Sequence, residues 1–279
     1  MTLHTWTDEE LPQGSDEWLQ ARCGVLTAST IGRLITVGTI GAIGYGCPDC
    51  GAEVDQPCMS KASKTPKPIS TFHSARHEIA AEVGATSLSI AHTDTANALL
   101  LNLAAERISG HVEEVFVSSA MQRGTDDEPY ARDAYAEWAK WEVEQIGFAV
   151  RDEPDDAIRV GYSPDGLVGE PGLIECKSRG QARQLSTIVD DTVPTENLAQ
   201  IHCGLWVMDR AWCDYISYRD GLHLYVKRVH RDPLWDKAIR DAAIYAERVI
   251  TGYVTTYTEH TKGLPFVEKR PDLIDTITF

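Results

Sequence analysis

The stretch YSPDGLVGEPGLIECK, residues 162–177, decides how the rest of the chain is interpreted. Asp165 follows a Ser-Pro pair, and Glu175 and Lys177 follow it in the pattern D-x9-E-x-K. The glycines and proline between them favour a tight turn, and residues 173–177 alternate like a strand, so we predict a hairpin. Residues two apart in a strand point the same way. Glu175 and Lys177 therefore share a face, against which the hairpin can fold Asp165.

Two acids and a lysine on one hairpin suit the hydrolysis of phosphodiesters. Carboxylate oxygens are the ligands that Mg²⁺ prefers, and Mn²⁺ accepts them too. A bound cation can orient or polarise the attacking water. The same pattern also occurs on exposed hairpins without a catalytic role, so the other segments of the chain must decide between the two interpretations.

The charge of the chain limits the kinds of partner it can have. Its 279 residues include 42 acidic and 26 basic side chains, a net charge of −16 at pH 7. Phosphate contacts need Lys and Arg, so this balance argues against a protein that coats DNA nonspecifically and predicts a narrow, enclosed DNA path. No apolar run approaches the ~20 residues of a membrane span. With no signal-peptide hydrophobic segment either, we expect a soluble, cytoplasmic protein without a membrane partner.

Three of the seven cysteines lie close together in CPDCGAEVDQPC, residues 47–58. In an intracellular protein this clustering favours a metal over disulfides, and Cys-x2-Cys predicts a metal-binding knuckle. A closed set of three thiolates and one imidazole is typical of structural zinc, and this segment has too few apolar residues to fold readily without the ion. The alternative is free thiols in a loop. The predicted zinc ligands are Cys47, Cys50, Cys58 and His73, with His77 as the alternative to His73.

Residues 15–35 predict two short helices. Ser15 begins the first, and Thr27 or Ser29 begins the second. A serine at the start of a helix, beside an arginine such as Arg22, can bind an anion. The competing interpretation of the spacing is that the serine only caps the helix and that Arg22 is an ordinary surface arginine.

Residues 119–141 predict a longer helix with an acidic start. Pro129 suits its first position, which places Glu128 in the first turn. Glu128 can then be a third acid beside the hairpin, or merely a carboxylate that stabilises the helix dipole. We expect Trp138 and Trp141 on the buried side of this helix.

The remaining elements complete an α/β pattern. Residues 195–209 form an amphipathic helix with Gln200 and His202 as polar members, and Asp220-Gly221 predicts a hairpin turn. The other predicted helices cover residues 94–109 and 233–250. The predicted strands cover residues 145–150, 157–161, 212–218 and 222–229.

The order of these pieces resembles the phage lambda-type alkaline exonucleases, also called YqaJ-like viral recombinases. The resemblance implies an α/β fold with a restriction-endonuclease-like PD-(D/E)xK core, a mixed central sheet flanked by helices. It rests on four motifs: EWL-x2-R-x-G-x2-TAS at residues 17–29, G-x3-E-x2-A at 124–131, SPDG with ECK at 163–177, and Gln200 with Trp206.

The resemblance also implies residue roles. The expected catalytic residues are Glu128, Asp165, Glu175 and Lys177. The three acids, with the backbone carbonyl of Cys176, would hold Mg²⁺ or Mn²⁺, and the lysine would position or activate the hydrolytic water. The positions that match ligands of the terminal 5′ phosphate, or of the phosphate near the cut, are Arg22, Ser29, Ser163 and Gln200.

The implied activity is a metal-dependent 5′-to-3′ exonuclease that degrades one strand of linear double-stranded DNA. Its product would be a 3′ single-stranded overhang for an annealing protein in phage recombination, inside the bacterial host. Members of this family often form rings, so we expect a homo-oligomer such as a trimer. The alternatives are a sequence- or structure-specific DNA endonuclease of the same fold, and a non-catalytic zinc-containing protein that binds DNA ends.

The cysteine-rich segment departs from the family pattern. It resembles zinc knuckles of actinobacterial phage proteins with the pattern C-P-x-C-G, P-C and H-x2-R, which favours His73 as the fourth ligand. We expect N-terminal helices of the nuclease domain over residues 1–45, the zinc-knuckle insertion over 46–78 and the nuclease core over 79–279. The hypothesis for the insertion is that it docks a partner, or grips DNA through Lys61, Lys64 and Lys67.

Overall fold

Residues 162–177 fold as the predicted hairpin in a computed structural model, which describes residues 1–61, 65–113 and 118–268. Strand β7 (Gly166–Val168) pairs antiparallel with β8 (Gly172–Ser178). Strand β8 then pairs in parallel with β9 (Trp212–Tyr218), which pairs antiparallel with β10 (Tyr225–His230). The strand order is β10-β9-β8-β7, so the predicted mixed sheet is confirmed.

A second sheet lies beside the first. Its order is β1-β5-β6-β2, and an isolated bridge between Glu144 and Leu167 links the approach to β5 with β7. Strands β5 and β6 confirm the strands predicted near residues 145–161, whereas no strand was predicted for β1 or β2. The bounds are Thr2–Thr7 for β1, Leu26–Thr27 for β2, Ile146–Glu153 for β5 and Ile158–Tyr162 for β6.

Four helices cover one side of these sheets: α2 (Ala28–Ile31), α4 (Asp94–Ser109), α7 (Thr195–Met208) and α8 (Pro233–His260). They share one large apolar core with the strands, in which Leu100, Leu205 and Ile239 are almost fully buried. Burying a side chain of this size contributes about 1.5–3 kcal/mol. Helix α7 is buried along most of its length because it packs against both sheets, so the side chains that it presents to the site are firmly held.

The predicted helix over residues 94–109 is confirmed, and the closing helix continues ten residues past its predicted end at 250. Ser15 and Thr27 begin α1 (Asp16–Arg22) and α2 as predicted. None of the helices within the described ranges has both the length and the apolar character needed to cross a membrane. Helix α6 (Gln181–Asp190), which packs against β9 and β10, was not predicted.

Helix α5 (Ser119–Ala139) differs from its prediction. Its first helical residue is Ser119, ten residues before the predicted first position at Pro129, so Glu128 does not lie in a first turn. Proline removes one N–H donor, but the helix continues because Ala131 and Tyr135 are buried against the sheet. The predicted burial of the tryptophans was also wrong, since Trp138 is 65% exposed.

The reason lies at the end of the helix. Trp138 is seven residues from Ala131 and shares its helix face, but there it borders an open cavity of about 510 Å³ beside Val226 and Arg228. Trp141 lies two residues past Ala139, the last helical residue, and borders the same cavity with 49% of its surface exposed. Helical periodicity predicts a shared face, but it cannot show where the opposing surface ends.

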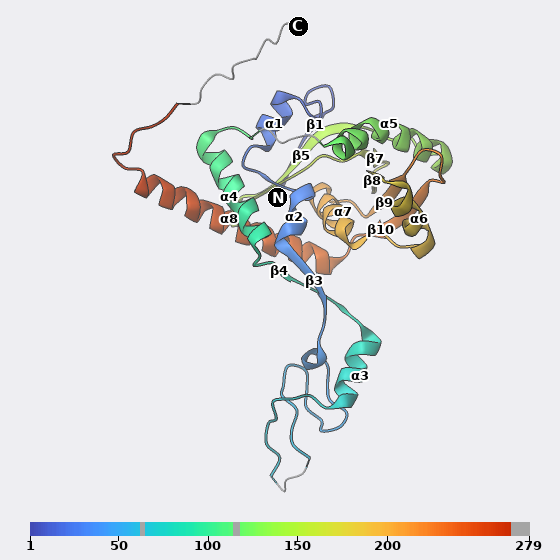
Figure 1. The fold of residues 1–279 in the computed structure, drawn as a ribbon, viewed down its shortest axis with the longest axis vertical. Coiled ribbons are helices and arrows are strands. Elements are labelled where there is room, and N and C mark those ends of the chain that lie inside the picture. The colour runs from blue at the N-terminus through green and yellow to red at the C-terminus, as the bar shows by residue number, and fades with distance from the viewer. Residues whose placement is uncertain (62–64, 114–117, 269–279) are drawn as a thin grey trace.

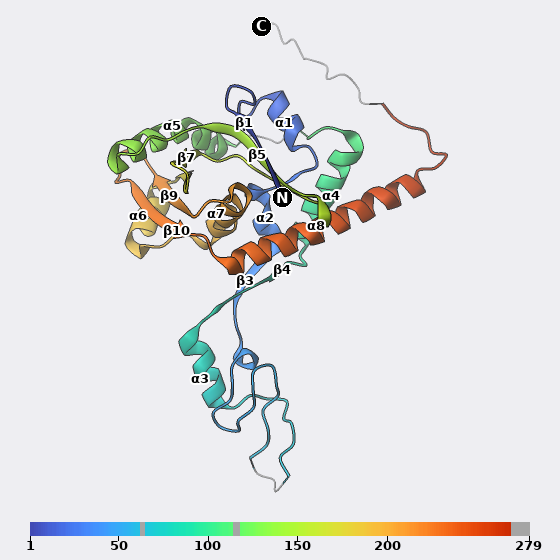
Figure 2. The same ribbon diagram turned by 180° about the vertical axis from the view of Figure 1, so that it is seen from behind.

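The cysteine-rich segment lies at the end of a long arm, residues 35–90. Strands β3 (Ile35–Thr39) and β4 (Thr86–Ile90) pair antiparallel and lead away from the body, and Figures 1 and 2 show the loops and α3 (Ser74–Val83) at the far end. Within the described residues, this ribbon is a sheet of two strands only. The predicted bounds of the zinc-knuckle insertion, residues 46–78, stay a prediction. The paired strands β3 and β4 show that the arm also includes residues before 46 and after 78.

Candidate active site and zinc site

Glu175 lies at the centre of the candidate active site. Its side chain is fully buried in β8, and the Lys177 ammonium donates a hydrogen bond to one of its oxygens. The Tyr162 hydroxyl, at the end of β6, donates to the other oxygen at 3.2 Å. Gly204 of α7 allows the tyrosine to lie here, because a Cβ at that position would be only 2.6 Å from the Tyr162 ring. As predicted, Glu175 and Lys177 share one face of the strand.

Asp165 and Glu128 complete the acidic cluster from two other elements. The Asp165 carboxylate, just before β7, accepts a hydrogen bond from the backbone N–H of Cys176 at 2.6 Å. Glu128 of α5 accepts one from Arg132 at 2.5 Å. The Nε of Arg132 also donates to the backbone carbonyl of Asp165 at 2.8 Å. This arginine therefore ties α5 to the hairpin.

Burial and neighbouring carboxylates oppose the ionisation of Asp165 and Glu128. Burial, followed by the charges of Glu175 and Glu128, raises the pKa of Asp165 well above its ordinary value. Burial also raises the pKa of Glu128, although the charge of Arg132 opposes that shift. Burial alone would lower the pKa of Lys177, but the charges of Glu175 and Asp165 raise it above its ordinary value. The protein alone leaves this cluster with an excess of negative charge, which favours an additional cation.

The donor set fits a divalent cation. Glu128, Asp165 and Glu175 offer carboxylate oxygens, the hard ligands that Mg²⁺ and Mn²⁺ take in proteins. Glu128, Asp165 and Glu175 outnumber the two cations that contact them, Arg132 and Lys177. An all-oxygen set of ligands suits either ion.

One cavity of about 460 Å³ is lined by the predicted phosphate ligands and by every predicted catalytic residue except the fully buried Glu175. The predicted phosphate ligands on its wall are Arg22, Ser29, Ser163 and Gln200. The predicted catalytic and metal-binding residues on the same wall are Glu128, Asp165, Cys176 and Lys177. Residues far apart in the sequence thus face a common space large enough for a phosphate group and the water around it.

Trp18 positions two of these phosphate ligands. Its indole N–H donates to the Ser163 hydroxyl at 3.0 Å, and the Arg22 guanidinium lies 3.9 Å from the centre of its ring. Burial lowers the pKa of Arg22 to about 10. This value is still well above neutral pH, so the guanidinium stays positively charged. The Ser29 hydroxyl lies 3.1 Å from that of Thr27, at the start of α2. The cavity therefore has a cationic end, opposite in charge to its acidic cluster.

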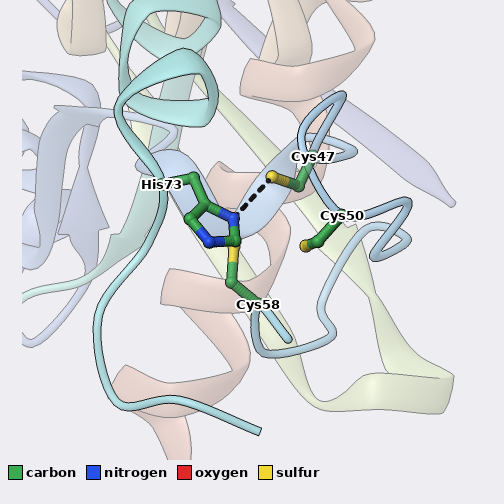
Figure 3. Close-up of side chains that lie close together, drawn as sticks. All are labelled: Cys47, Cys50, Cys58 and His73. Atoms are coloured by element: carbon green, nitrogen blue, oxygen red, sulfur yellow. Dashed lines mark hydrogen bonds between the residues drawn. The ribbon is translucent and has the colours of Figure 1, made fainter. Parts of the chain in front are cut away.

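The arm holds the second candidate metal site. One ligand atom from each of its residues lies within 4.8 Å of all the others, and Figure 3 shows the side chains converging. The Cys47 sulfur and the His73 Nδ1 are 3.4 Å apart. His77 meets the ring of Phe72 edge-on and is not part of the cluster. The residues brought together are Cys47, Cys50, Cys58 and His73, the first of the two predicted ligand sets.

The sequence analysis missed several residues that support these sites. Arg132 lies four residues after Glu128 on a helix, a spacing that brings side chains into contact and could have revealed it. Tyr162 directly precedes the SPDG motif, but only the tertiary structure shows that its hydroxyl meets Glu175. Arg76 is the arginine of the H-x2-R pattern, but only the tertiary structure shows that it is fully buried in the arm.

Comparison with known families supports the same assignment. The sequence matches the model of the YqaJ-like viral recombinase domain over residues 71–211, just over half of the chain. The chain belongs to the YqaJ-like viral recombinase family. A second family model, described as a "Putative DNA-binding phage zinc finger domain", matches residues 13–95 of the same chain. That match includes the whole cysteine cluster, so the cluster and the model both indicate zinc.

Solved structures show the same fold. The crystal structure of an alkaline exonuclease, LHK-Exo from Laribacter hongkongensis, is similar with a TM-score of 0.61 and 24% identity. The match covers 90% of this chain and 100% of that one. A complex of LHK-Exo with dAMP gives the same TM-score and coverage at 23% identity. Among curated proteins, no sequence matches this chain significantly. The predicted PD-(D/E)xK nuclease fold is confirmed, and the family supports a nuclease acting on DNA.

Proposed function

We propose that this chain is a metal-dependent exonuclease that degrades one strand of linear double-stranded DNA from the 5′ end. The product is a 3′ single-stranded overhang, the substrate of an annealing protein in phage recombination. The observation that carries the proposal is the shared cavity, which has a cationic end at Arg22 and an acidic end at Asp165. An end-dependent nuclease needs both, because it must hold a terminal phosphate while it cuts the next one.

In this proposal, Arg22 and Ser163 bind the terminal phosphate with charge-assisted hydrogen bonds, and Trp18 keeps both in place. Ser29 and Gln200 border the same phosphate. Lys177, which is held by its hydrogen bond to Glu175, donates an N–H to position the hydrolytic water.

The acidic end of the cavity serves the metal ion. Glu128, Asp165, Glu175 and the carbonyl of Cys176 hold the divalent cation, Mg²⁺ or Mn²⁺. When bound, that cation supplies Lewis-acid polarisation of the scissile phosphate and lowers the pKa of a bound water.

The decisive experiment is digestion of linear duplex DNA that carries a 5′ phosphate or a 5′ hydroxyl, with and without Mg²⁺. We expect a cation-dependent release of mononucleotides from the 5′ end. The 5′-hydroxyl substrate should be cut at least about tenfold more slowly, since it loses a charge-assisted contact with Arg22. Arg22→Gln should abolish most of this difference, whereas the exposed Arg33→Gln should leave it unchanged.

Two further assays separate the alternatives. An endonuclease of the same fold would cut covalently closed circular DNA, which an exonuclease leaves intact. A non-catalytic end-binding protein would bind ends without any cation-stimulated hydrolysis. Asp165→Asn keeps the shape of the side chain and should lower the rate at least about a hundredfold in a folded protein. Full activity in this variant would exclude the proposed site.

The proposal extends to partners and setting. A homo-oligomeric ring, with a trimer as the first candidate, would enclose DNA and suit the acidic composition of the chain. The setting is the cytoplasm of a phage-infected bacterium, where linear DNA ends and an annealing protein are both available. Co-sedimentation with the annealing protein of the same phage tests the partnership.

The zinc arm is proposed to dock that partner or to contact DNA. Lys61 already pairs with Asp49 at 2.9 Å, and Lys67 is exposed. Lys64 lies outside the described residues. Lys61→Ala and Lys67→Ala together should weaken DNA binding if the arm grips DNA, and leave it unchanged if the arm docks a protein.

A further inference from the structure

Arg76 occupies an unusual place in the arm. It is fully buried in α3, where its Nε donates to the carbonyl of Tyr45 at 2.6 Å. One terminal nitrogen donates to the carbonyl of Gln56 at 2.7 Å. The other donates to the carbonyls of Ile43 and Glu53, both at 2.9 Å. A single side chain therefore holds two separate loop segments, residues 43–45 and 53–56, beside the cysteine cluster.

The charge of Arg76 has no acidic partner among the residues of the described ranges. Its nearest ionisable neighbour is Cys58, whose sulfur accepts a hydrogen bond from Arg76 at 3.5 Å. Burying a charge is expensive unless an opposite charge and hydrogen bonds compensate it. The carbonyls satisfy the N–H groups, but they do not balance the charge.

A bound zinc ion would make the cluster the missing partner. Three thiolates and one neutral imidazole around Zn²⁺ leave the centre with a net negative charge. We propose that Arg76 is the charge-balancing residue of the zinc site. Its guanidinium neutralises the anionic zinc centre beside Cys58, and its carbonyl contacts fix the loops that present the ligands.

Arginine suits this role better than lysine does. Its planar guanidinium has five N–H donors, and here they meet five acceptors, the four carbonyls and the Cys58 sulfur. Lysine would keep the charge with only three donors on a flexible stem. The role does not depend on the proposed nuclease function, because the zinc site is separate from the acidic cavity.

The test is a cobalt titration of the full chain and of the variants Arg76→Gln, Arg76→Lys and Lys67→Gln. Cobalt bound to thiolates gives a charge-transfer absorption, so the carboxylate site of the body contributes no signal. Zinc is then added to displace the cobalt. Lys67→Gln is the matched control, because it removes an exposed cation from the same arm.

We expect Arg76→Gln to weaken metal binding by about 10–100-fold, the usual effect of losing a partner of a metal ligand. Arg76→Lys should lose less, because it keeps the charge, and Lys67→Gln should stay within about twofold of the unchanged chain. Binding by Arg76→Gln at full affinity would overturn the proposal. So would an equal loss in Arg76→Lys and Arg76→Gln, since the hydrogen bonds alone would then account for the effect. Circular dichroism of the metal-free chains checks that the body is folded in each variant.

Discussion

The body and the arm hold their candidate metal sites in opposite ways. The acidic site of the body draws residues from segments between Arg22 and Gln200, and a large apolar core holds these segments in place. The zinc site draws all its ligands from residues 47–73, with a very small cluster of buried side chains around it. Three of the six residues in that cluster are predicted zinc ligands. We therefore expect the body to fold without a metal and the arm to need its metal in order to fold.

Each site also contains an arginine, and the two arginines differ in what balances their charge. Arg132 pairs with the carboxylate of Glu128 and so belongs to the charge balance of the protein itself. Arg76 contacts carbonyls and a thiol, and its balance depends on the metal centre. Stability that comes from a packed core survives removal of a metal, and stability that comes from a metal does not.

Removal of zinc should have the largest effect. Structural zinc contributes about 10–16 kcal/mol of apparent binding free energy in zinc-finger peptides, far more than this small cluster can supply. We expect a strong chelator to unfold the arm and leave the body folded. Trypsin should then cut after Arg76, which is fully buried in the folded arm. Mass spectrometry of the fragments and zinc analysis by atomic absorption measure the result.

Lys61 is the internal control for this experiment, because it is exposed in the folded arm. Trypsin should cut after Lys61 whether or not zinc is present. If cleavage after Arg76 is equally fast with and without zinc, the arm holds its own fold and the contrast with the body is broken.

The body should respond to acid through His202, for a reason that involves no metal. This side chain is buried, stacks on Trp235 with ring centres 4.9 Å apart, and its Nδ1 has no hydrogen-bond partner within the described residues. Burial lowers the pKa of His202 to about 4 from its ordinary 6.5. Between these values the unfolded chain binds a proton that the folded chain does not, so stability is complete above pH 6.5 and falls towards pH 4.

The expected loss is roughly 3 kcal/mol across this range. Urea unfolding at several pH values measures it, and His202→Phe, which can keep the stacking, should flatten the slope. The exposed His223→Phe should retain the slope of the unchanged chain. Parallel slopes in all three proteins would mean that His202 does not titrate in this way.

Replacing Arg132 should give the smallest of these effects. Arg132→Met removes the hydrogen bonds to Glu128 and to the carbonyl of Asp165, so the acids lose their orientation. We expect a fall in nuclease activity of about 10–100-fold, with a higher cation concentration needed for half-maximal rate. Steady-state rates over a Mg²⁺ titration measure both.

Arg132→Lys should recover part of the loss, because it keeps the charge beside Glu128. The exposed Arg33→Met should have no effect. An unchanged cation requirement in Arg132→Met would show that the body site tolerates loss of its arginine, which would sharpen the contrast with Arg76.

Much of the candidate site could be predicted because its key pattern is local. Residues two apart on a strand share a face, so Glu175 and Lys177 had to lie together once residues 173–177 formed a strand. The cysteine spacing predicts a knuckle in the same way. Glu128 and Arg22 were predicted from the family motif, since nothing in their own segments shows what they face.

The failures have one physical cause. The periodicity near Trp138 predicts which residues share a helix face, but exposure depends on whether another element covers that face. A proline such as Pro129 weakens a helix locally, yet burial of Ala131 and Tyr135 on the sheet outweighs that cost. In both cases a long-range contact decided against a local preference.

The sequence by itself determined the chemistry of this protein: a hairpin with two acids and a lysine, a cysteine-rich knuckle and the family to which both belong. The tertiary structure alone decided how this chemistry is assembled. It placed Arg22 and Asp165 on one cavity, brought the Tyr162 hydroxyl to Glu175 and buried Arg76 beside a thiolate. Side-chain type and short spacing are encoded locally, whereas burial and charge balance depend on which distant segments pack together.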